Sequence, residues 1–490
     1  MSELNSPAEG GPGDLGAKVN HGLRWSAANQ VVNRILTFAS GVVVLRILSV
    51  ESVGTFGAAF AIITLILAVN ELGLIPTMVQ WSDRPEHTGR TAYTLALASS
   101  VFWFVLVVVT APWLSELIGI AGLTVPLRIV AITILVDGVT SVPNAFVMRE
   151  FRQRGLAIAE TLGMFVQIGV SIGLAVAGAG AAALAWGQTL SNAVAGAVLV
   201  LFVAPRIVPG WDRTVVKPLL RFSTSISAAA LVRDGGVNAD SLVVGGTLGA
   251  TQLGYYQLAF NLGSLPVNLI GATISRVSLA GFARLGTDRD RMREALRRST
   301  MYLLAITVPM VALIAALAGP IVAFVYGPKW APAVEVLRFL VVLGGLRVLV
   351  MLLLDMCIAD GRPRVELVAF GVWLVILLPA IWIGARTHGI VGAAVVHVAV
   401  MAAVVLPIVL RALQQSGLHP AAALRASIRP LVAGTVAGAA AYATSLWFGR
   451  SLVQIIVGGV VGLLVMAVGT LPGNHDLSWN SLRRWRGQLA

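Results

Sequence analysis

One short stretch of the sequence places ionisable residues inside an otherwise apolar region. Residues 221–246 read RFSTSISAAALVRDGGVNADSLVVGG, with Arg233, Asp234, Asn238 and Asp240 between long hydrophobic runs. An arginine guanidinium stays protonated and offers paired donors that match phosphate geometry, whereas a carboxylate inside a membrane can hold a proton or a cation. These residue types therefore predict anion binding or cation coupling, provided that the stretch crosses a membrane.

The composition indicates that the stretch belongs to a membrane protein. The 490 residues are 57% hydrophobic and 12% charged, and the mean hydropathy is +0.86, whereas soluble domains average about 45–50% apolar and about 25% charged residues. Apolar runs of the ~20 residues that a spanning helix needs recur almost to the end of the chain. Runs of this length without alternation favour helices over the strands of a β-barrel.

These runs predict an all-α polytopic membrane protein with about fourteen transmembrane helices. The predicted spans are 24–46, 53–79, 91–113, 123–147, 156–178, 181–204, 221–247, 251–280, 299–325, 334–359, 364–384, 389–411, 428–448 and 451–471.

Lysine and arginine residues predict the orientation of these helices, because cytoplasmic loops carry an excess of both. With the N-terminus inside, about 25 basic residues fall in cytoplasmic segments and about five in outer loops. Both termini are therefore predicted to lie in the cytoplasm. The densest basic cluster, residues 284–298, is predicted to form a short amphipathic cytoplasmic helix.

The same distribution explains the net charge of +13 without a nucleic-acid partner. Basic residues that alternate with membrane spans form no contiguous groove for a nucleic acid. They set the topology and attract anionic lipid headgroups. Membrane lipids, and no nucleic acid, are the partners that the charge distribution predicts.

The sequence lacks the features of several kinds of enzyme site. It has no G-x-x-x-x-G-K-[ST] loop for ATP, and its single cysteine, Cys357, lies inside a predicted span, which argues against disulfides and thiolate metal sites. Only His397 lies within a predicted span, where a histidine is more often a packed polar residue than a ligand. No predicted loop exceeds about 20 residues, which leaves no room for a soluble catalytic domain. We therefore predict a protein that is not an enzyme and holds no cofactor.

An internal repeat divides the chain. Residues 53–62, VGTFGAAFAI, match residues 253–262, LGYYQLAFNL, at the same place in each half. Both copies follow a span that starts at the cytoplasmic side, so the repeats are parallel and related by an axis along the membrane normal. The residues in register are Gly54 with Gly254, Phe56 with Tyr256, Ala59 with Ala259 and Phe60 with Phe260.

The repeat predicts two lobes of six helices each, followed by two further helices. The predicted divisions are a disordered cytoplasmic tail over 1–22, an N-lobe over 23–205, a C-lobe over 206–427, helices 13 and 14 over 428–473, and a cytoplasmic tail over 474–490.

The first two helices carry a family resemblance. Residues 45–80, LRILSVESVGTFGAAFAIITLILAVNELGLIPTMVQ, resemble the N-terminal signature of Wzx-type polysaccharide transporters. These belong to the multidrug/oligosaccharidyl-lipid/polysaccharide export superfamily. The resemblance rests on LRIL at 45–48, E-S-V-G-x-F at 51–56, and E-L-G-L with the later Val-Gln at 71–80. Helix number and repeat extend the likeness to the whole chain.

The resemblance implies a fold and an activity. The fold would be two six-helix lobes around a central cavity, with two extra helices at the end. The activity would be translocation of an undecaprenyl-diphosphate-linked oligosaccharide, or a similar glycolipid, across the bacterial plasma membrane by alternating access. Its substrate would be this lipid-linked oligosaccharide, its partners a polysaccharide polymerase and assembly proteins, and its coupling ion a proton or Na⁺.

The buried charges predict where such a headgroup binds. Arg34 and Arg233 lie at mid-depth in the first and seventh predicted helices, at equivalent places in the two repeats. A charge at the bilayer centre costs at least ~2.5–3.5 kcal/mol, so it normally faces a partner or a wet cavity. We predict a cationic cavity for the headgroup phosphates, to which Arg276 and Arg347 add charge. The polar residues predicted to line it or to take part in coupling are Asp234, Asn238, Asp240, Glu71 and Asp137.

Other readings of the same residues remain open at this stage. The arginines and acids can instead neutralise one another and hold the lobes together. A peptidoglycan-precursor lipid flippase would share a cationic cavity. A cation-coupled small-molecule antiporter of the same superfamily would place an acidic residue where Arg34 stands. The sequence does not distinguish protons, Na⁺, the membrane potential and downstream polymerisation as the driving force, nor does it identify the glycan.

Overall fold

The computed structural model describes residues 36–70, 85–150, 152–205, 207–219, 236–271, 278, 281–282, 288–449 and 451–470. Every regular element in these ranges is a helix. Nine of the described helices are long and apolar enough to cross a membrane. The prediction of an all-helical membrane protein is confirmed.

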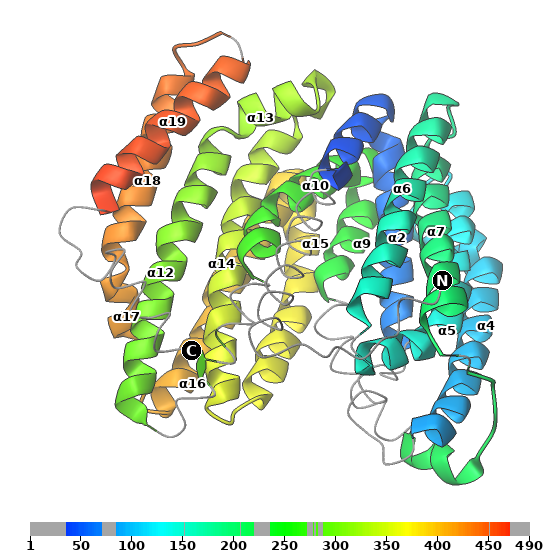
Figure 1. Ribbon diagram of the computed structural model, residues 1–490. Coiled ribbons are helices and arrows are strands. Elements are labelled where there is room, and N and C mark those ends of the chain that lie inside the picture. Colours follow the sequence, from blue (N-terminus) through cyan, green and yellow to red (C-terminus); the bar gives the residue numbers. More distant parts are fainter. Residues whose placement is uncertain are drawn as a thin grey trace, which may run out of the picture.

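Helices of the first half of the chain stand side by side (Figure 1). A helical segment over Leu36–Ile47 precedes them. Within this group α4 packs on α5, and α7 packs on both α5 and α6. The bounds are α2 (Val50–Asn70), α4 (Pro85–Ile118), α5 (Thr124–Arg149), α6 (Gln153–Val176), α7 (Ala181–Val198) and the π-helix η1 (Leu199–Val203).

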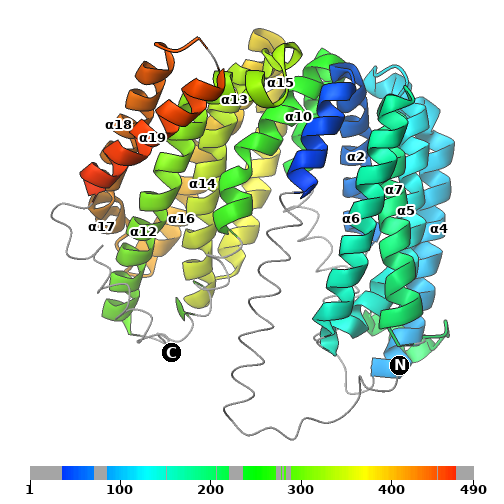
Figure 2. The same ribbon diagram turned by 45° about the horizontal axis from the view of Figure 1, so that its top comes forward.

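The second half forms a neighbouring group, and α18 and α19 lie at its outer edge in both views (Figures 1 and 2). They contact α12 and α13. The bounds are α9 (Gly236–Leu248), α10 (Ala250–Gly263), η3 (Val267–Gly271), α12 (Arg289–Ala316), α13 (Ala318–Val325), η4 (Pro328–Trp330), α14 (Ala333–Ala359), α15 (Arg364–Val400), η5 (Met401–Val405), α16 (Leu406–Gln415), α17 (Pro420–Ala426), α18 (Ile428–Ser445) and α19 (Ser451–Thr470).

The long helix α15 contains a reversal of the chain. His388 and Gly389 have non-helical backbone angles, and Gly389 has φ +61°, which favours glycine. A Cβ atom on Gly384 would lie 2.7 Å from the carbonyl oxygen of Gly392, whereas residues eight apart in one helix are about 12 Å apart. The two arms on either side of the reversal lie in the predicted spans 364–384 and 389–411.

The separate amphipathic helix predicted over 284–298 is wrong in its described part. Residues from 289 onward form the first turns of α12, which continues without a break into its apolar part. Asp288 caps this helix by accepting a hydrogen bond from the backbone N–H of Arg291 at 3.1 Å. An ion pair between Glu294 and Arg297, 2.8 Å long, then supports the second turn. The sequence contains neither Gly nor Pro there to end the helix.

The two repeat copies pack directly against each other. A Cβ atom on Gly54 of α2 would lie 1.8 Å from the carbonyl oxygen of Ala250, and one on Gly254 of α10 would lie 2.2 Å from that of Val50. Small residues allow such close approach of two helices. The contact is reciprocal. Gly54 meets Ala250, which lies four positions before Gly254, and Gly254 meets Val50, which lies four positions before Gly54. Such reciprocity is typical of elements related by a twofold axis.

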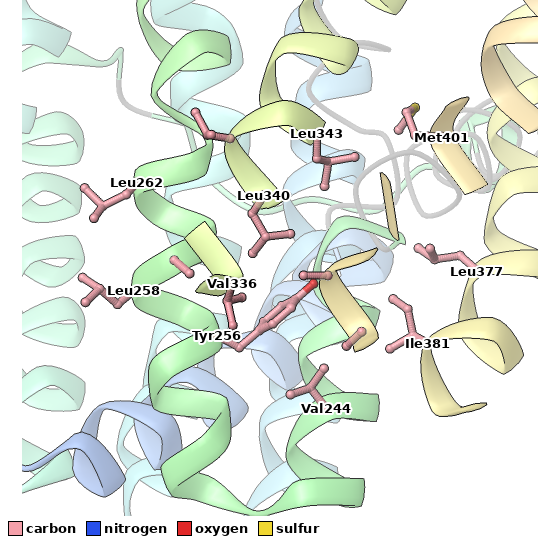
Figure 3. Packing of buried hydrophobic residues seen from close by; sticks show 14 of the residues in the cluster. Val244, Tyr256, Leu258, Leu262, Val336, Leu340, Leu343, Leu377, Ile381 and Met401 are labelled. Atoms are coloured by element: carbon pink, nitrogen blue, oxygen red, sulfur yellow. The ribbon is translucent and has the colours of Figure 1, made fainter. Parts of the chain in front are cut away.

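The hydrophobic core continues from this contact into the second half. Figure 3 shows the ring of Tyr256 on α10 among Val244 of α9 and Val336 and Leu340 of α14. Aliphatic side chains of α9 and α14 thereby surround the ring of Tyr256. This arrangement places the buried hydroxyl described next.

Candidate functional site

Asp240 is the centre of a buried polar network in the second half. Its side chain is fully buried on α9. One carboxylate oxygen accepts a hydrogen bond of 2.9 Å from the Tyr256 hydroxyl, and the other accepts one of 2.6 Å from the backbone N–H of Ser241. Buried carboxylates are tolerated when such donors surround them. The helix pair α9 and α10 therefore holds the acid in one position.

His397 joins the network from the second arm of α15. Its Nδ1 atom lies 3.3 Å from the Tyr256 hydroxyl oxygen and 3.5 Å from a carboxylate oxygen of Asp240. The imidazole is 2% exposed and packs beside the rings of Trp373 and Phe260, with centroids 5.7 and 6.4 Å away. The residue is thus a packed polar side chain, as predicted, and it also contacts a charged group.

Arg347 supplies the positive charge of this region. Its guanidinium lies 6.0 Å from the ring centroid of Phe260 and interacts electrostatically with Asp240. A cation and an anion that interact inside a protein offset part of the cost of burying each. The structure therefore brings together two of the predicted site residues, from helices that are about a hundred residues apart in sequence.

The network reaches the contact between the two halves. The amide of Gln257 on α10 donates a hydrogen bond of 3.1 Å to the hydroxyl of Ser241. A Cβ atom on Gly57 of α2 would lie 2.9 Å from Cγ of the same glutamine. Hydrogen bonds thus connect Asp240 through Ser241 to Gln257, which lies where α2 packs on α10.

The first half contains its own polar cluster around Asp137 of α5. The side-chain amide of Asn70 on α2 donates 2.8 Å to a carboxylate oxygen of Asp137 and 2.9 Å to the hydroxyl of Ser100. The hydroxyl of Ser99 donates 3.0 Å to the amide oxygen of Asn70. Asn70 thus joins α2, α4 and α5, and Asp137 keeps one oxygen that these contacts do not use.

The predicted site residues fall into three groups. Arg347 and Asp240 lie together in the second half, and Asn238 is half-buried on α9, two positions before Asp240. Asp137 lies in the first half in a different cluster. The predicted residues that fall outside the described part of the chain are Arg34, Glu71, Arg233, Asp234 and Arg276.

Among the network members that sequence reasoning missed, Tyr256 and Asn70 are the ones that donate side-chain hydrogen bonds to the two acids. A signal for Tyr256 was present in the repeat, since it stands where the first copy has Phe56. Because the second copy has a tyrosine hydroxyl where the first copy has none, a hydrogen-bond partner is expected in the second half only. Asn70 offered no comparable signal, because it lies beyond residues 53–62 and so has no matched residue in the second copy of the repeat.

A second contact joins the two halves at the end where α2 and α10 begin. Arg46 donates a hydrogen bond of 2.7 Å from Nε to the carbonyl oxygen of Val325, where α13 ends. Lys329 donates from Nζ to the carbonyl oxygens of Arg46 at 2.8 Å and Leu48 at 2.6 Å. Each cation thus satisfies free carbonyl groups of the opposite half. We call these contacts the Arg46–Lys329 clasp. Partial burial lowers the pKa of Lys329.

An apolar groove lies between α18 and α19. It encloses about 840 Å³. Its walls are aliphatic, and two arginines stand at the end where α17 meets α18. We call it the α18–α19 groove; it is lined by Arg425, Ile428, Arg429, Val432, Ala433, Val436, Leu464, Val465, Val468 and Gly469.

Comparisons with known proteins agree with this fold. Residues 43–335 match the family described as polysaccharide biosynthesis protein. The chain is 23% identical to the lipopolysaccharide biosynthesis protein WzxC of Escherichia coli over 381 residues, 77% of each chain. It is 25% identical to the teichuronic acid biosynthesis protein TuaB of Bacillus subtilis over 60% of this chain.

The match spans 61% of the length of TuaB. Among solved structures, the fold resembles the lipid II flippase MurJ in an inward closed conformation, with a TM-score of 0.77, 14% identity, and coverage of 94% of this chain and 99% of MurJ. The family match covers more than half of the sequence. The chain therefore belongs to the polysaccharide biosynthesis family of Wzx-like transporters, within the multidrug/oligosaccharidyl-lipid/polysaccharide export superfamily, and is a transporter rather than an enzyme.

Proposed function

We propose that this transporter moves a polyprenyl-diphosphate-linked oligosaccharide from the cytoplasmic to the outer leaflet of a bacterial plasma membrane by alternating access. The observation that carries the proposal is the α18–α19 groove. Aliphatic walls suit the lipid chain of such a substrate, and Arg425 and Arg429 at one end suit anionic lipid at the membrane surface. The family membership supports a polysaccharide precursor as the cargo.

The proposed architecture has fourteen helices, in lobes over 23–205 and 206–427 with two further helices over 428–473. Helical residues lie within every predicted span, which supports this count. The reciprocal contact of Gly54 and Gly254 supports a twofold relation between the lobes. Both termini are proposed to lie in the cytoplasm, from the distribution of basic residues.

The proposed headgroup site is the cavity between the lobes. Arg34 and Arg233 are its proposed phosphate ligands, on the repeat argument, with Arg276 as a further cation. Arg347 interacts electrostatically with Asp240, which supports a role in stabilising that acid as well as in attracting an anion. A polysaccharide polymerase and assembly proteins are proposed to receive the translocated product.

A flipping assay tests the proposal. The purified protein is placed in liposomes with a polyprenyl-diphosphate oligosaccharide that carries a fluorescent glycan label, and a membrane-impermeant quencher reports the leaflet. We expect translocation by the wild type. Val436→Trp, which fills the α18–α19 groove, should slow translocation by at least about tenfold, because the lipid chain can no longer bind in the groove.

The matched control is Ile456→Trp on α19. Val436 is 51% exposed and Ile456 is 56% exposed, but only Val436 lines the groove, so the control should behave as the wild type. Absence of translocation by the wild type would contradict the proposal. Flipping of only a peptide-bearing lipid would favour a peptidoglycan-precursor flippase, and export of only soluble cations would favour the antiporter.

A further inference from the structure

A short segment leads from the first half of the chain toward the second. It follows η1, which ends at Val203, and the structure describes its residues 207–219, of which 213–219 are helical. We call residues 207–219 the linker segment. In Figure 1 its green ribbon lies at the foot of the first group of helices, beside the blue start of α4. It takes no part in the α18–α19 groove.

Hydrogen bonds hold the linker segment against the first turns of α4. The hydroxyl of Thr94 donates 2.7 Å to the carbonyl oxygen of Gly210, and the backbone N–H of Gly210 donates 3.1 Å to the carbonyl oxygen of Arg90. The backbone N–H of Asp212 donates 3.1 Å to the hydroxyl of Thr91. The backbone of the linker segment is therefore fixed relative to the first half.

Two apolar side chains of this fixed segment point away from the protein. Trp211 is 58% exposed and Val208 is 62% exposed, and the Nε atom of Arg90 donates 3.3 Å to the carbonyl oxygen of Val208. On the inner side, Leu219 is buried and Val215 packs against the same cluster. The segment thus buries one set of apolar residues against the first half and presents a second set outward.

The depth of the linker segment indicates what surrounds the exposed pair. The apolar span of α4 begins at Thr88, and the residues of α4 that bond the linker segment, up to Thr94, lie within about the first two turns of that span. The segment therefore lies where the span enters the bilayer. Tryptophan is enriched at this level, because its ring is apolar and its N–H is polar. Lipid headgroups are thus the neighbours that the indole of Trp211 fits.

Basic residues surround the exposed pair. Arg213 and Lys217 are exposed and lie four positions apart on the helical residues 213–219, so they share one side of that helix. The carboxylate of Asp212 accepts 2.9 Å from the backbone N–H of Thr214, which fixes the start of the helix. An anionic leaflet attracts each basic residue near its surface with about 1 kcal/mol. The nearby ends of α5 and α6 add the exposed residues Arg149, Arg152 and Arg154.

We propose that the linker segment binds the anionic surface of the bilayer, with Trp211 and Val208 among the lipid headgroups and with Arg213 and Lys217 beside the lipid phosphates. The inference goes beyond the proposed function and needs no lipid-linked substrate. Because the segment is fixed to α4, this anchor holds the first half at one depth. A change of access is then expected to move the second half relative to an anchored first half.

A fluorescent label on the linker segment tests the inference. The full-length protein carries Val208→Cys on a Cys357→Ala background, which removes its single natural cysteine, and is placed in nanodiscs of phosphatidylcholine with or without phosphatidylglycerol. Acrylamide, a neutral quencher, reports exposure to water. Quenching should be at least about threefold weaker than for the same label at Asp290→Cys, since the side chain of Asp290 at the start of α12 is 91% exposed. Trp211→Ala should raise quenching to that reference level.

The matched control is Trp447→Ala, which removes an indole that is 86% exposed at the end of α18 and should leave the quenching unchanged. Shielding should be stronger with phosphatidylglycerol, and Arg213→Gln with Lys217→Gln should abolish this difference between the two lipid compositions. Quenching at residue 208 equal to the Asp290→Cys reference, or shielding that Trp211→Ala does not alter, would overturn the inference. Shielding that appears only in native membranes would assign the segment to a protein partner and overturn it as well.

Discussion

The hydroxyl of Tyr256 lies in the hydrophobic core with two polar groups in reach. It donates to Asp240 at 2.9 Å and lies 3.3 Å from the imidazole of His397. The residue is fully buried. The hydroxyl therefore supplies one of the few donors that make a buried carboxylate tolerable, and its removal affects the acid more than the core packing.

Replacement of Tyr256 by Phe tests this role. The ring remains, but a carboxylate oxygen of Asp240 loses its side-chain donor, which costs about 1–3 kcal/mol for a buried group. We expect the melting temperature of the purified protein to fall by several degrees. The control is Tyr255→Phe, because Tyr255 packs edge-on against Trp330 and is not a member of the network. Equal melting temperatures for both variants would assign the Tyr256 hydroxyl no structural role.

The residues of this site were predictable only in part. Arg347 and Asp240 stood out in the sequence because charges are expensive in an apolar run. Their proximity did not, since it depends on how α9, α10, α14 and α15 pack. His397 looked like an ordinary buried polar residue until its neighbours were known. Charged residues within a span can thus be recognised in the sequence, whereas their contacts with residues of other helices are known only from the fold.

At the scale of elements, the hydrophobic runs predicted the helices well because a membrane imposes one length and one composition. Helix ends and irregularities were less accessible. The continuation of α12 into the basic cluster depends on the Asp288 cap and local ion pairs. A search for apolar runs does not include such charged residues. The π-helical turns that follow α7 and α10 had no signal in composition.

The Arg46–Lys329 clasp is an element-scale contact that can open. It consists of hydrogen bonds from two cations to main-chain carbonyl groups at helix ends, beside the buried Trp330, whose indole donates to the carbonyl oxygen of Leu45 at 3.2 Å. Bonds to a charged group contribute about 1.5–3 kcal/mol each. A contact of this kind can hold one arrangement of the two halves and still be exchanged for water in another.

Removal of the clasp should shift the arrangement of the halves. We predict that Arg46→Gln with Lys329→Gln raises the ratio of separated to joined α2 and α10 by at least about tenfold. Spin labels at Glu51→Cys and Thr251→Cys, on a Cys357→Ala background, report this separation by electron–electron distance measurement. Arg386→Gln serves as the control, because Arg386 packs on Trp382 within one half. An unchanged distance distribution would show that the clasp does not hold the halves.

At the scale of the whole molecule, the two halves meet through matching residues of the two copies of the sequence repeat. Gly54 and Gly254 each meet a main-chain oxygen of the other copy, so the contact is as close as two helices permit. The halves therefore have little freedom to slide here, and a change of access requires this contact to separate or pivot. Figure 1 shows α2 and α10 between the two groups of helices, where such a pivot would act on both.

A side chain at either glycine should therefore block the joined arrangement, and the two substitutions should act alike. Gly54→Leu and Gly254→Leu each place carbon atoms where a main-chain oxygen lies, which no rotamer can avoid. We expect both variants to insert in the membrane, to show separated α2 and α10 in the spin-label measurement, and to lose flipping by at least about tenfold. Gly371→Leu is the control, since no heavy atom lies within 4 Å of a Cβ atom there. If one glycine tolerates leucine and the other does not, the halves are not functionally equivalent about a twofold axis, and the pivot must lie elsewhere.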